Sequence, residues 1–330
     1  MSKHSNNNNS NKSTGALVDL VVLREGDEDS NNNDEIKTIE QSANLNVRPE
    51  YGLGFVPWEE KARQELCETP ERRRKCLVEM RQRVKEIDEF RPYVEDRFLL
   101  GFLRIRKFDV DRALKSYKKF FKMRLFNPDK YIPIGQGTLE LRERFELGVG
   151  AMLRKRNPID NTGIFILRVG DWTPETGYDL SDIFSPCALG LLFYALDDTS
   201  QVYGVRFILD LRGLHMGHLK CFPLSAIRAL LHLVQDAFPL RFKGFHVLQN
   251  HTFIDYLYFM AKPFLSRKMQ KRIHMLGSDV TKLHEHICPS ILPEEYGGQD
   301  GPFDWRPFVE PLYEIHDWAV QFSYFGYGCE

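Results

Sequence analysis

The sequence predicts an α/β protein with a helical N-terminal lobe and a second lobe built on a mixed, largely parallel sheet. Up to residue 126 the apolar residues recur at helical spacing. Beyond residue 147, short apolar runs alternate with helical stretches of about a dozen residues. Such stretches are long enough to carry the chain back across a sheet, so consecutive strands can run parallel.

Residues 1–50 are expected to form a disordered leader. This stretch consists largely of Asn and Ser runs and lacks aromatic side chains. It holds five Lys/Arg and nine Asp/Glu, a net charge of −4, whereas the whole chain has a formal charge of −1. The remainder is therefore slightly basic. Nothing in this balance requires nucleic acid, and a local cationic patch is the more informative feature to seek.

Residues 51–126 are predicted to form the helical lobe. Helical patterns occupy four stretches of it: 57–68, 69–90, 96–102 and 109–126. In the last of these, Ala113, Tyr117, Phe120 and Phe121 fall on one face, which we expect to be buried. The basic run 72–75 is typical of a solvated helix surface.

The second lobe is predicted to span residues 140–300. Strands are expected on both sides of a turn at 157–163, within 202–214 and within 244–249. Helices are expected at 185–197 and 224–236. The apolar run 188–196 is far shorter than the roughly 20 residues that cross a bilayer, so it predicts a core helix.

The segment 301–330 is unusually aromatic. Its apolar residues recur at helical spacing: Phe308, Leu312, Ile315, Ala319 and Phe322. This pattern predicts a helix that packs back onto the domain in preference to an independent membrane anchor.

An apolar helix beside a basic helix is the most informative local feature of the chain. Residues 251–264 are rich in large apolar side chains, and the basic run 266–273 follows at once. Between residues 237 and 275 there are seven Lys/Arg and a single acid. On a helix Lys268, Lys271 and Arg272 would share a face. This combination favours a protein that touches anionic lipid and handles an apolar molecule.

The apolar helix carries a stripe that we predict to act as a gate. Its members stand at i, i+3, i+4 and i+7: Phe253, Tyr256, Leu257 and Met260. Pro263 ends or kinks the element and supplies a hinge. Ordinary core packing is the alternative explanation of the stripe. The basic run favours the gate, because the apolar and cationic side chains would then reach a bilayer together.

Several kinds of enzyme are disfavoured by spacing. No glycine-rich segment has the strand–glycine–helix order of a dinucleotide site, and neither a nucleotide-binding GxxxxGK[ST] loop nor a GxSxG elbow is present. His284 and His286 stand at i and i+2, whereas a zinc-binding helix needs i and i+4. Asp210, near Arg206 and Arg212, is better explained as a salt-bridged residue closing a strand than as a catalytic acid. We therefore predict no catalytic residue, metal or cofactor.

The six cysteines are scattered without CxxC spacing, and no apolar signal region begins the chain. This usage is typical of free thiols in a reducing cytosol.

Three stretches together resemble the CRAL-TRIO lipid-binding family, in particular its tocopherol transfer protein, retinaldehyde-binding protein and clavesin branch. They are DRFLLGFLRIRKFDVDRA (96–113), QDAFPLRFKGFHVLQN (235–250) and KPFLSRKMQKRIHMLGSDVTKLHEHICPSILPEEYGG (262–298). The resemblance covers about residues 56–298. It implies a sheet that floors one lipid cavity and a hinged amphipathic helix that opens at membranes.

The resemblance also implies a phosphoinositide-binding site. The basic positions that match it are Arg106, Arg241, Lys243, Lys268 and Arg272. Two of these exchange Arg and Lys relative to the branch. Charge is retained, but bidentate phosphate geometry depends on which of the two is present.

The cavity wall is expected to draw on the apolar strands and on two of the helices. The candidates are Phe165, Leu167, Leu191, Tyr194, Phe207, Leu209, Leu230, Phe245 and Val247. Only one set of alternate residues in each strand can face a ligand, and the sequence does not decide which set does.

These features predict a monomeric, non-enzymatic cytoplasmic carrier of one hydrophobic ligand. It would dock reversibly on phosphoinositide membranes, endosomal ones among them, and exchange cargo through the gate. The alternative is a phosphoinositide-binding trafficking adaptor that transfers no lipid.

Overall fold

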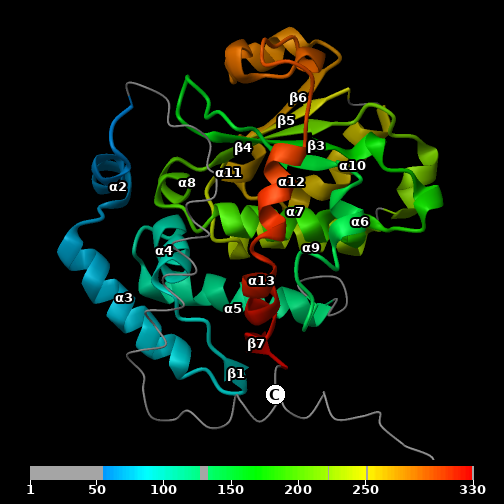
Figure 1. Ribbon diagram of the computed structural model, residues 1–330. Helices are drawn as coiled ribbons and strands as arrows, with labels where there is room; N and C mark the ends of the chain where they lie inside the picture. Colours follow the sequence, from blue (N-terminus) through cyan, green and yellow to red (C-terminus); the bar gives the residue numbers. More distant parts are fainter. Residues whose placement is uncertain (1–54, 127–132, 222, 250–251, 329–330) are drawn as a thin grey trace, which may run out of the picture. The chain divides into compact units, whose positions relative to one another are not determined.

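A computed structural model describes residues 55–126, 133–221, 223–249 and 252–328 (Figure 1). All of them belong to the unit Leu45–Glu330. The expected leader, residues 1–50, lies outside the described residues. Among the described helices, none is both long and apolar enough to cross a bilayer.

The described part of the N-terminal lobe contains four helices, as the periodicity predicts: α2 (Trp58–Leu66), α3 (Pro70–Lys85), α4 (Asp96–Ile105) and α5 (Val110–Phe126). Side chains cap two of them. Thr69 Oγ1 accepts the Arg72 N–H of α3 at 3.2 Å, and a Glu95 carboxylate oxygen accepts the Phe98 N–H of α4 at 2.7 Å. The predicted apolar face of α5 is buried, and Tyr117 packs edge-on against Phe98 with ring centroids 5.8 Å apart.

The second lobe is built on a five-stranded sheet in the order β2-β3-β4-β5-β6. The strands are β2 (Gly150–Met152), β3 (Gly163–Arg168), β4 (Val205–Asp210), β5 (Phe242–Leu248) and β6 (Ile273–Gly277). Only β2 is antiparallel to its neighbour, and the other adjacent pairs are parallel. The predicted fold class, α/β with a mixed and largely parallel sheet, is confirmed.

The predicted basic helix at 266–273 is wrong in its second half. Helix α11 (Arg267–Gln270) has only four residues, and β6 begins at Ile273. The Arg272 carbonyl accepts the Phe245 N–H of β5 at 2.7 Å, so this backbone already belongs to the sheet. Pairing with a buried strand overrides local helix propensity here. Lys271 and Arg272 therefore lie beyond the end of the helix.

Helices cover one face of the sheet: α7 (Leu180–Tyr194), α9 (Leu224–His232) and α10 (Thr252–Ala261). A π-turn, η4 (Leu233–Ala237), follows α9. Short helices also connect the elements, namely α6 (Arg142–Phe145), α8 (Asp198–Tyr203) and the 3₁₀ turns η1 (Val169–Asp171), η2 (Pro174–Thr176), η3 (Met216–Cys221) and η5 (Lys262–Phe264). Asp179 and Asp182 form a capping box that fixes the start of α7.

The segment 280–297 covers the opposite face of the sheet. It contains η6 (Val280–Glu285), η7 (Pro289–Ile291) and η8 (Glu294–Tyr296). Its buried apolar side chains pack against those of the strands, among them Leu283, Ile287, Ile291 and Leu292 against Ile164, Ile166 and Ile208. Gly298 ends the segment where a Cβ would lie 1.8 Å from the Leu292 carbonyl oxygen, so only glycine fits.

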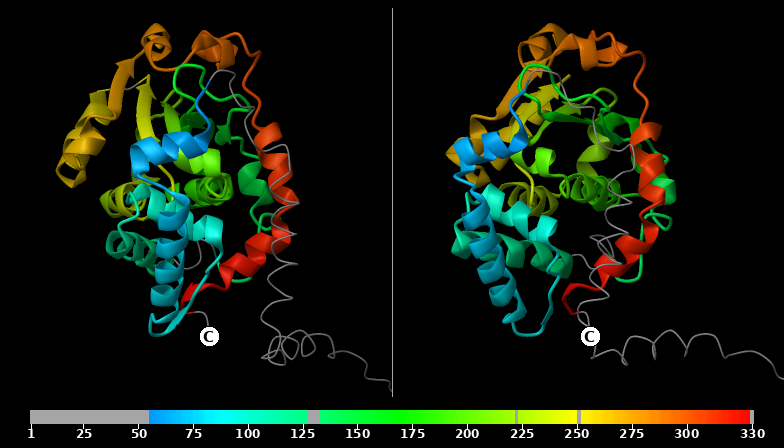
Figure 2. Two further views of the ribbon diagram at one scale, coloured as in Figure 1. Left: turned by 90° about the vertical axis from the view of Figure 1, so that its left-hand side faces the viewer. Right: turned by 60° about the vertical axis from the view of Figure 1, so that its left-hand side comes forward.

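The C-terminal tail contacts both lobes (Figure 2). It forms α12 (Arg306–Tyr313), α13 (His316–Ser323) and β7 (Gly326–Tyr327), which pairs with β1 (Phe90–Arg91). Phe308 packs edge-on against Phe165 of the sheet, with ring centroids 5.8 Å apart. Phe322 packs against Phe98 of the helical lobe at 5.5 Å. The helical spacing in this segment thus corresponds to two helices in place of one.

Arg104 joins the helical lobe to the second lobe. Its side chain is buried in α4 and donates hydrogen bonds to both carboxylate oxygens of Glu68, at 2.8 and 2.9 Å. It also donates to Gln201 of α8 at 2.6 Å and forms an ion pair with Asp198. A buried guanidinium tolerates this position only because acceptors surround it.

We predict that Glu68→Ala lowers the free energy of unfolding by about 3–5 kcal/mol, because it leaves a buried charge without its main partner. Denaturant unfolding monitored by circular dichroism measures this change. The matched control is Glu79→Ala, since Glu79 pairs with Arg83 on the surface at 3.5 Å. That change should cost no more than about 1 kcal/mol. Equal losses in the two variants would contradict the interpretation.

Candidate functional site

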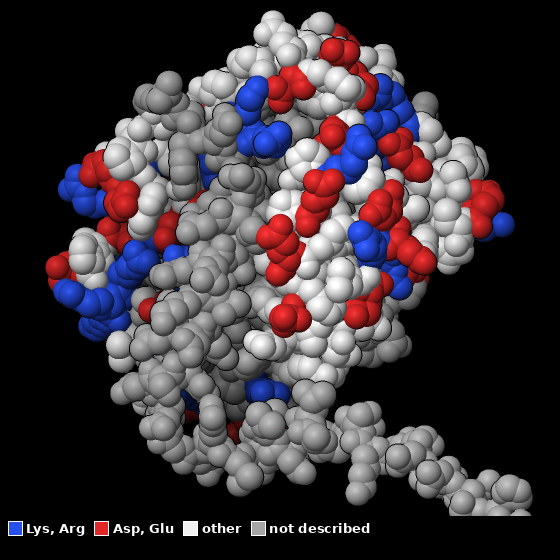
Figure 3. Space-filling model, in the orientation of Figure 1, with Lys and Arg blue, Asp and Glu red and all other residues white. Residues whose placement is uncertain are grey.

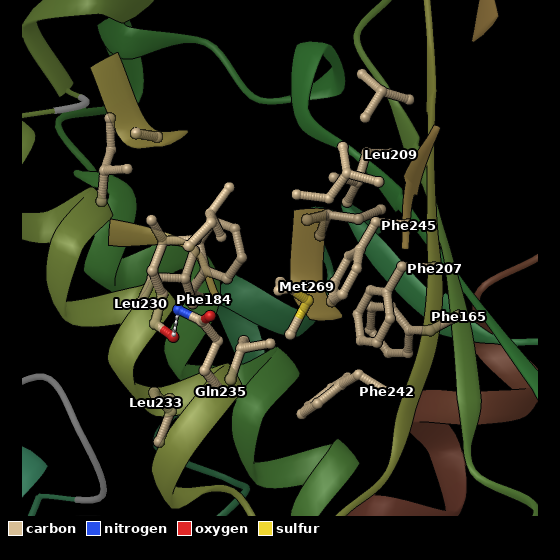
Figure 4. Close-up of a pocket in the computed structure, with 18 of the residues that line it drawn as sticks. Phe165, Phe184, Phe207, Leu209, Leu230, Leu233, Gln235, Phe242, Phe245 and Met269 are labelled. Atoms are coloured by element: carbon tan, nitrogen blue, oxygen red, sulfur yellow. Dashed lines mark hydrogen bonds between the residues drawn. The ribbon is translucent and has the colours of Figure 1, made fainter. Parts of the chain in front are cut away.

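An apolar cavity of about 310 Å³ lies between the sheet and the helices that cover it (Figure 4). Its floor consists of alternate residues of four parallel strands, which register with one another across the sheet. One row is Phe165, Phe207, Phe245 and Ile273, and the next is Leu167, Leu209, Val247 and Met275. Because side chains alternate along a strand, these rows leave the intervening residues for the opposite face.

Phenylalanine rings form much of this floor. The Phe207 ring lies 5.2 Å from the Phe165 and Phe245 rings and 5.6 Å from that of Phe242. Phe184, Leu230 and other helix residues face them across the cavity in Figure 4. None of the described lining residues is charged, so the cavity suits an uncharged apolar molecule.

The predicted lining residues lie at this cavity with one exception. Tyr194 is not among the lining residues and requires a correction. It is the last residue of α7, and its ring lies beside the Arg156 guanidinium, 5.7 Å from the ring centroid. A Cβ built on Gly163, at the start of β3, would lie 2.0 Å from the Tyr194 hydroxyl. The side chain therefore occupies the end of the sheet where β3 begins.

Sequence reasoning missed several lining residues. Helix α7 contributes Phe184, Cys187 and Ala188 in addition to Leu191, a set at i, i+3, i+4 and i+7 that helical periodicity could have found. Ile273 and Met275 were missed because β6 itself was not predicted. Met269 of α11 also lines the cavity.

Helix α10 turns Ile254, Tyr258 and Ala261 toward the cavity. The side chains predicted to form the gate, Phe253, Tyr256, Leu257 and Met260, lie outside the described part of the structure. Phe259 is 71% exposed, so this helix presents a large apolar side chain to the surroundings. A helix with apolar groups toward both the cavity and the exterior is suited to a position over a lipid site.

Gln235 connects the π-turn after α9 to the segment that follows α10. Its amide nitrogen donates hydrogen bonds to the Phe264 carbonyl at 3.0 Å and to the Leu231 carbonyl at 3.3 Å. Its amide oxygen accepts the Ser266 N–H at 2.8 Å. Gln235 is also the one amide side chain among the described lining residues. These bonds hold the predicted hinge around Pro263 in place.

The five predicted basic residues come together, and three of them are anchored by backbone carbonyls. The guanidinium of Arg106 donates to the Asp236 carbonyl at 2.8 Å, that of Arg241 to the Val202 carbonyl and that of Arg272 to the Phe242 carbonyl. A carbonyl fixes a guanidinium in position without neutralising it. Arg106 also lies 3.8 Å from the Asp236 carboxylate and Arg241 pairs with Glu65, so the charge of these two is partly compensated. This arrangement holds cations ready for an anionic group.

Glu65 is the main acid near this cluster. Its carboxylate accepts a hydrogen bond from Arg241 at 2.7 Å and lies 3.8 Å from the Lys243 ammonium nitrogen. Burial opposes ionisation of Glu65, but hydrogen bonds from Lys61 and Arg241 prevail and hold its pKa at about 2. Burial, aided by repulsion from Arg241, lowers the pKa of Lys243 to about 8. Lys61 and Arg241 share this carboxylate, at 2.8 and 2.7 Å, while Lys243 stays farther from it.

Lys268 is exposed at the edge of the cluster. Burial of part of its stem, together with the charges of Arg272, Arg241, Lys107 and Arg106, lowers its pKa. Lys107 is exposed and was missed by the sequence reasoning, although it directly follows Arg106. On the face that carries α12, by contrast, acidic and basic side chains are interspersed (Figure 3).

The residues considered for catalysis have structural partners. The buried carboxylate of Asp210 accepts hydrogen bonds from Arg212, at 2.5 to 3.1 Å, and from the Tyr296 hydroxyl at 2.9 Å. Arg206 pairs with Asp160 instead. His284 Nε2 lies 2.9 Å from the Tyr296 carbonyl oxygen, so this ring nitrogen already has a hydrogen-bond partner.

An α/β lobe with an apolar cavity on one sheet face and clustered cations beside it defines a class of binding protein for apolar molecules. Residues 158–298 match the CRAL/TRIO domain family. The Homo sapiens protein named alpha-tocopherol transfer protein-like is 31% identical over 245 residues, covering 74% of this chain and 70% of that protein.

Clavesin-2 of Homo sapiens is 31% identical over 258 residues, which cover 77% of each chain. The crystal structure of Sfh5 superposes with a TM-score of 0.49 at 15% identity, covering 81% of this chain and 100% of that one. On the sequence matches, the chain belongs to the CRAL-TRIO family of lipid-binding and lipid-transfer proteins.

We predict that Gln235→Leu increases amide hydrogen exchange in residues 262–266 by roughly tenfold, because it removes hydrogen bonds that hold this segment closed. Hydrogen exchange followed by mass spectrometry measures the change. Gln82→Leu on the exposed surface of α3 is the matched control and should leave this segment unchanged. Equal exchange in the two variants would show that Gln235 does not restrain the hinge.

Proposed function

We propose that this protein carries one uncharged hydrophobic ligand in its cavity and docks reversibly on phosphoinositide-containing membranes through the basic cluster. In this proposal it acts in the cytoplasm without catalysing a reaction, and α10 opens at the membrane to exchange cargo. One observation carries the proposal: the two registered rows of apolar side chains, rich in phenylalanine, that face an open space in place of a packed core.

The cavity argues for cargo because an unfilled apolar space is unfavourable. Protein interiors normally pack to the density of organic crystals, and voids forfeit dispersion contacts. A hydrophobic ligand that fills the space regains them. The uncharged lining disfavours a charged head group inside, so the ligand class is a neutral lipid. The name of the alpha-tocopherol transfer protein-like relative agrees with a ligand of this class.

The basic cluster supports docking because it is both concentrated and anchored. Arg106, Arg241 and Arg272 are held by carbonyls, while Lys268 remains exposed. Each Lys or Arg near an anionic surface contributes about 1 kcal/mol, so five contribute about 5 kcal/mol, enough for reversible binding. Helix α10 and α11 follow one another in the chain, which lets apolar and cationic groups approach a bilayer together.

We predict that the purified protein retains an apolar ligand at one molecule per chain and that Leu191→Trp displaces it. Leu191 lies in the cavity wall, and the larger indole would occupy the space of the ligand. Native mass spectrometry and lipid extraction measure the bound ligand. Leu125→Trp is the matched control, because Leu125 is 55% exposed on α5.

A wild-type protein free of ligand, with unchanged docking on phosphoinositide vesicles, would favour a trafficking adaptor over a carrier. Retention of ligand by Leu191→Trp at the level of the control would show that the cavity is not the ligand site. A matching thermal melt for both variants is needed to compare them.

We predict that binding to phosphoinositide vesicles weakens as pH rises through about 8, the pKa of Lys243. The free protein loses the Lys243 proton above this pH, whereas an adjacent phosphate favours the charged ammonium, so binding then requires proton uptake. The loss is at most about fivefold, the contribution of one lysine. Vesicle sedimentation between pH 7 and pH 9 measures it.

Lys243→Arg is the control variant, because a guanidinium does not lose its proton in this range. It should remove the pH dependence near 8 while retaining binding. The same pH dependence in this variant would show that Lys243 does not contact the head group. Rising pH has the opposite effect on the free energy of unfolding, which increases. The half-buried Lys243 charge is unfavourable below its folded pKa, so its cost to stability is relieved between about pH 8 and the ordinary lysine pKa of 10.5.

A further inference from the structure

Three histidine rings lie together on the sheet face opposite the cavity. His246 of β5 and His274 of β6 are register partners, so both project to the same side of the sheet. His286 follows η6 and approaches from the segment that covers this face. The ring centroids are 4.5 to 5.0 Å apart, and one nitrogen from each ring lies within 4.8 Å of the others.

Packing alone does not account for this cluster. His246 is fully buried, and neither of its ring nitrogens has a hydrogen-bond partner among the described residues. Buried polar atoms are nearly always paired, so an unpartnered imidazole at a cluster of other imidazoles indicates a missing partner. The same row of the sheet contributes Ile166 and Ile208, which are ordinary core residues.

The protonation of these rings is compatible with metal binding. Burial, followed by the charges of His286, Arg206 and His274, lowers the pKa of His246 to about 3. Burial also lowers the pKa of His274 and of His286. Neutral imidazoles keep a lone pair, so a cation would not have to displace protons at neutral pH.

We propose that His246, His274 and His286 form a binding site for a divalent transition-metal ion of the Zn²⁺ type. Three imidazole ligands with one position left to water are a known zinc arrangement, and imidazole also suits Cu²⁺ and Ni²⁺. Ligand nitrogens in a tetrahedral zinc site lie about 3.4 Å apart. The half-buried His274 and His286 rings would therefore turn inward on binding, to bring their nitrogens this close to that of His246.

Arg206 carries a fixed positive charge near the three histidines, and Asp160 compensates it. The Arg206 guanidinium faces the cluster, where it would oppose a second cation, but Asp160 accepts two hydrogen bonds from it, at 2.7 and 2.9 Å. Gly244 leaves the space between these groups open. A Cβ at this position would lie 2.8 Å from Arg206 Nη1 and 3.0 Å from His246 Nε2. The glycine thus keeps a buried ring nitrogen of His246 unobstructed.

Such a site would tie β5, β6 and the covering segment together behind the cavity floor. Phe245 and Val247, which flank His246 in β5, line the cavity on the other face. The site is separate from the ligand cavity and from the basic cluster, so it stands or falls independently of the proposed carrier function.

The test is titration of untagged, metal-free full-length protein with Zn²⁺ by isothermal calorimetry. The expected result is one ion per chain, with the affinity reduced at least about 100-fold in His274→Ala and in His286→Ala. A thermal melt should shift upward with Zn²⁺ in the wild type and not in these variants. His284→Gln is the matched control, because His284 stands two residues from His286 yet contacts the Tyr296 carbonyl.

Zn²⁺ affinity in His274→Ala and His286→Ala equal to that of the control would overturn the proposal. So would the absence of one-to-one binding in the wild type. A second measurement avoids dependence on folded variants: Co²⁺ added to the wild type should give the visible absorption of nitrogen-coordinated cobalt. Its absence would leave the three rings as stacked packing groups.

Discussion

Side-chain alternation along four registered parallel strands is the constraint on which this structure depends. Phe165, Phe207 and Phe245 stand side by side because their strands pair without a shift at these positions. The same alternation sends Ile166, Ile208 and His246 to the other face. One face can therefore stay open while the other is packed, and a slip of one residue in any strand would exchange the two.

Because one face of the sheet is left open, the packed face must contribute more of the stability. The floor residues cannot contribute full packing energy without a ligand, so the apolar cluster beneath the segment 280–297 must supply much of the stability of the sheet. Anchors of other kinds add to it. Arg104 joins the lobes through buried ion pairs, and the tail places Phe308 against Phe165 from outside the cavity. The contacts that stabilise this protein therefore lie outside the cavity.

Much of the fold could be predicted from the sequence, because most elements carry strong local patterns. The four N-terminal helices and the strands β3, β4 and β5 follow apolar periodicity alone. Strand β6 could not be found this way. Its basic neighbours Lys268 and Lys271 favour a helix, and the decisive hydrogen bond joins the Arg272 carbonyl to Phe245, a residue far back in the chain. A strand this short, defined by pairing with a residue distant in sequence, shows no recognisable hydrophobic periodicity.

The residues of the candidate site likewise fall into those that local patterns predict and those that depend on the tertiary fold. Candidates for the cavity floor could be chosen from strand patterns, but the face that stays hollow is decided by what covers each side. Tyr194 was misplaced because helical spacing does not reveal where a helix ends relative to a cavity. The three-histidine cluster was equally hidden, since it unites His246, His274 and His286 from three separate segments. His284 and His286 stand two residues apart in the sequence, but only His286 belongs to the cluster.

In the basic cluster the fold holds like charges together while neutralising only some of them, through Glu65 and Asp236. Arg106, Arg241 and Arg272 each donate hydrogen bonds to backbone carbonyls from distant parts of the chain. Mutual repulsion remains, and the lowered pKa values of Lys243 and Lys268 record it together with the effect of burial. A polyanionic head group would relieve this repulsion without rearranging the guanidinium groups. In the proposed docking, the free energy of binding would come from the relief of this repulsion.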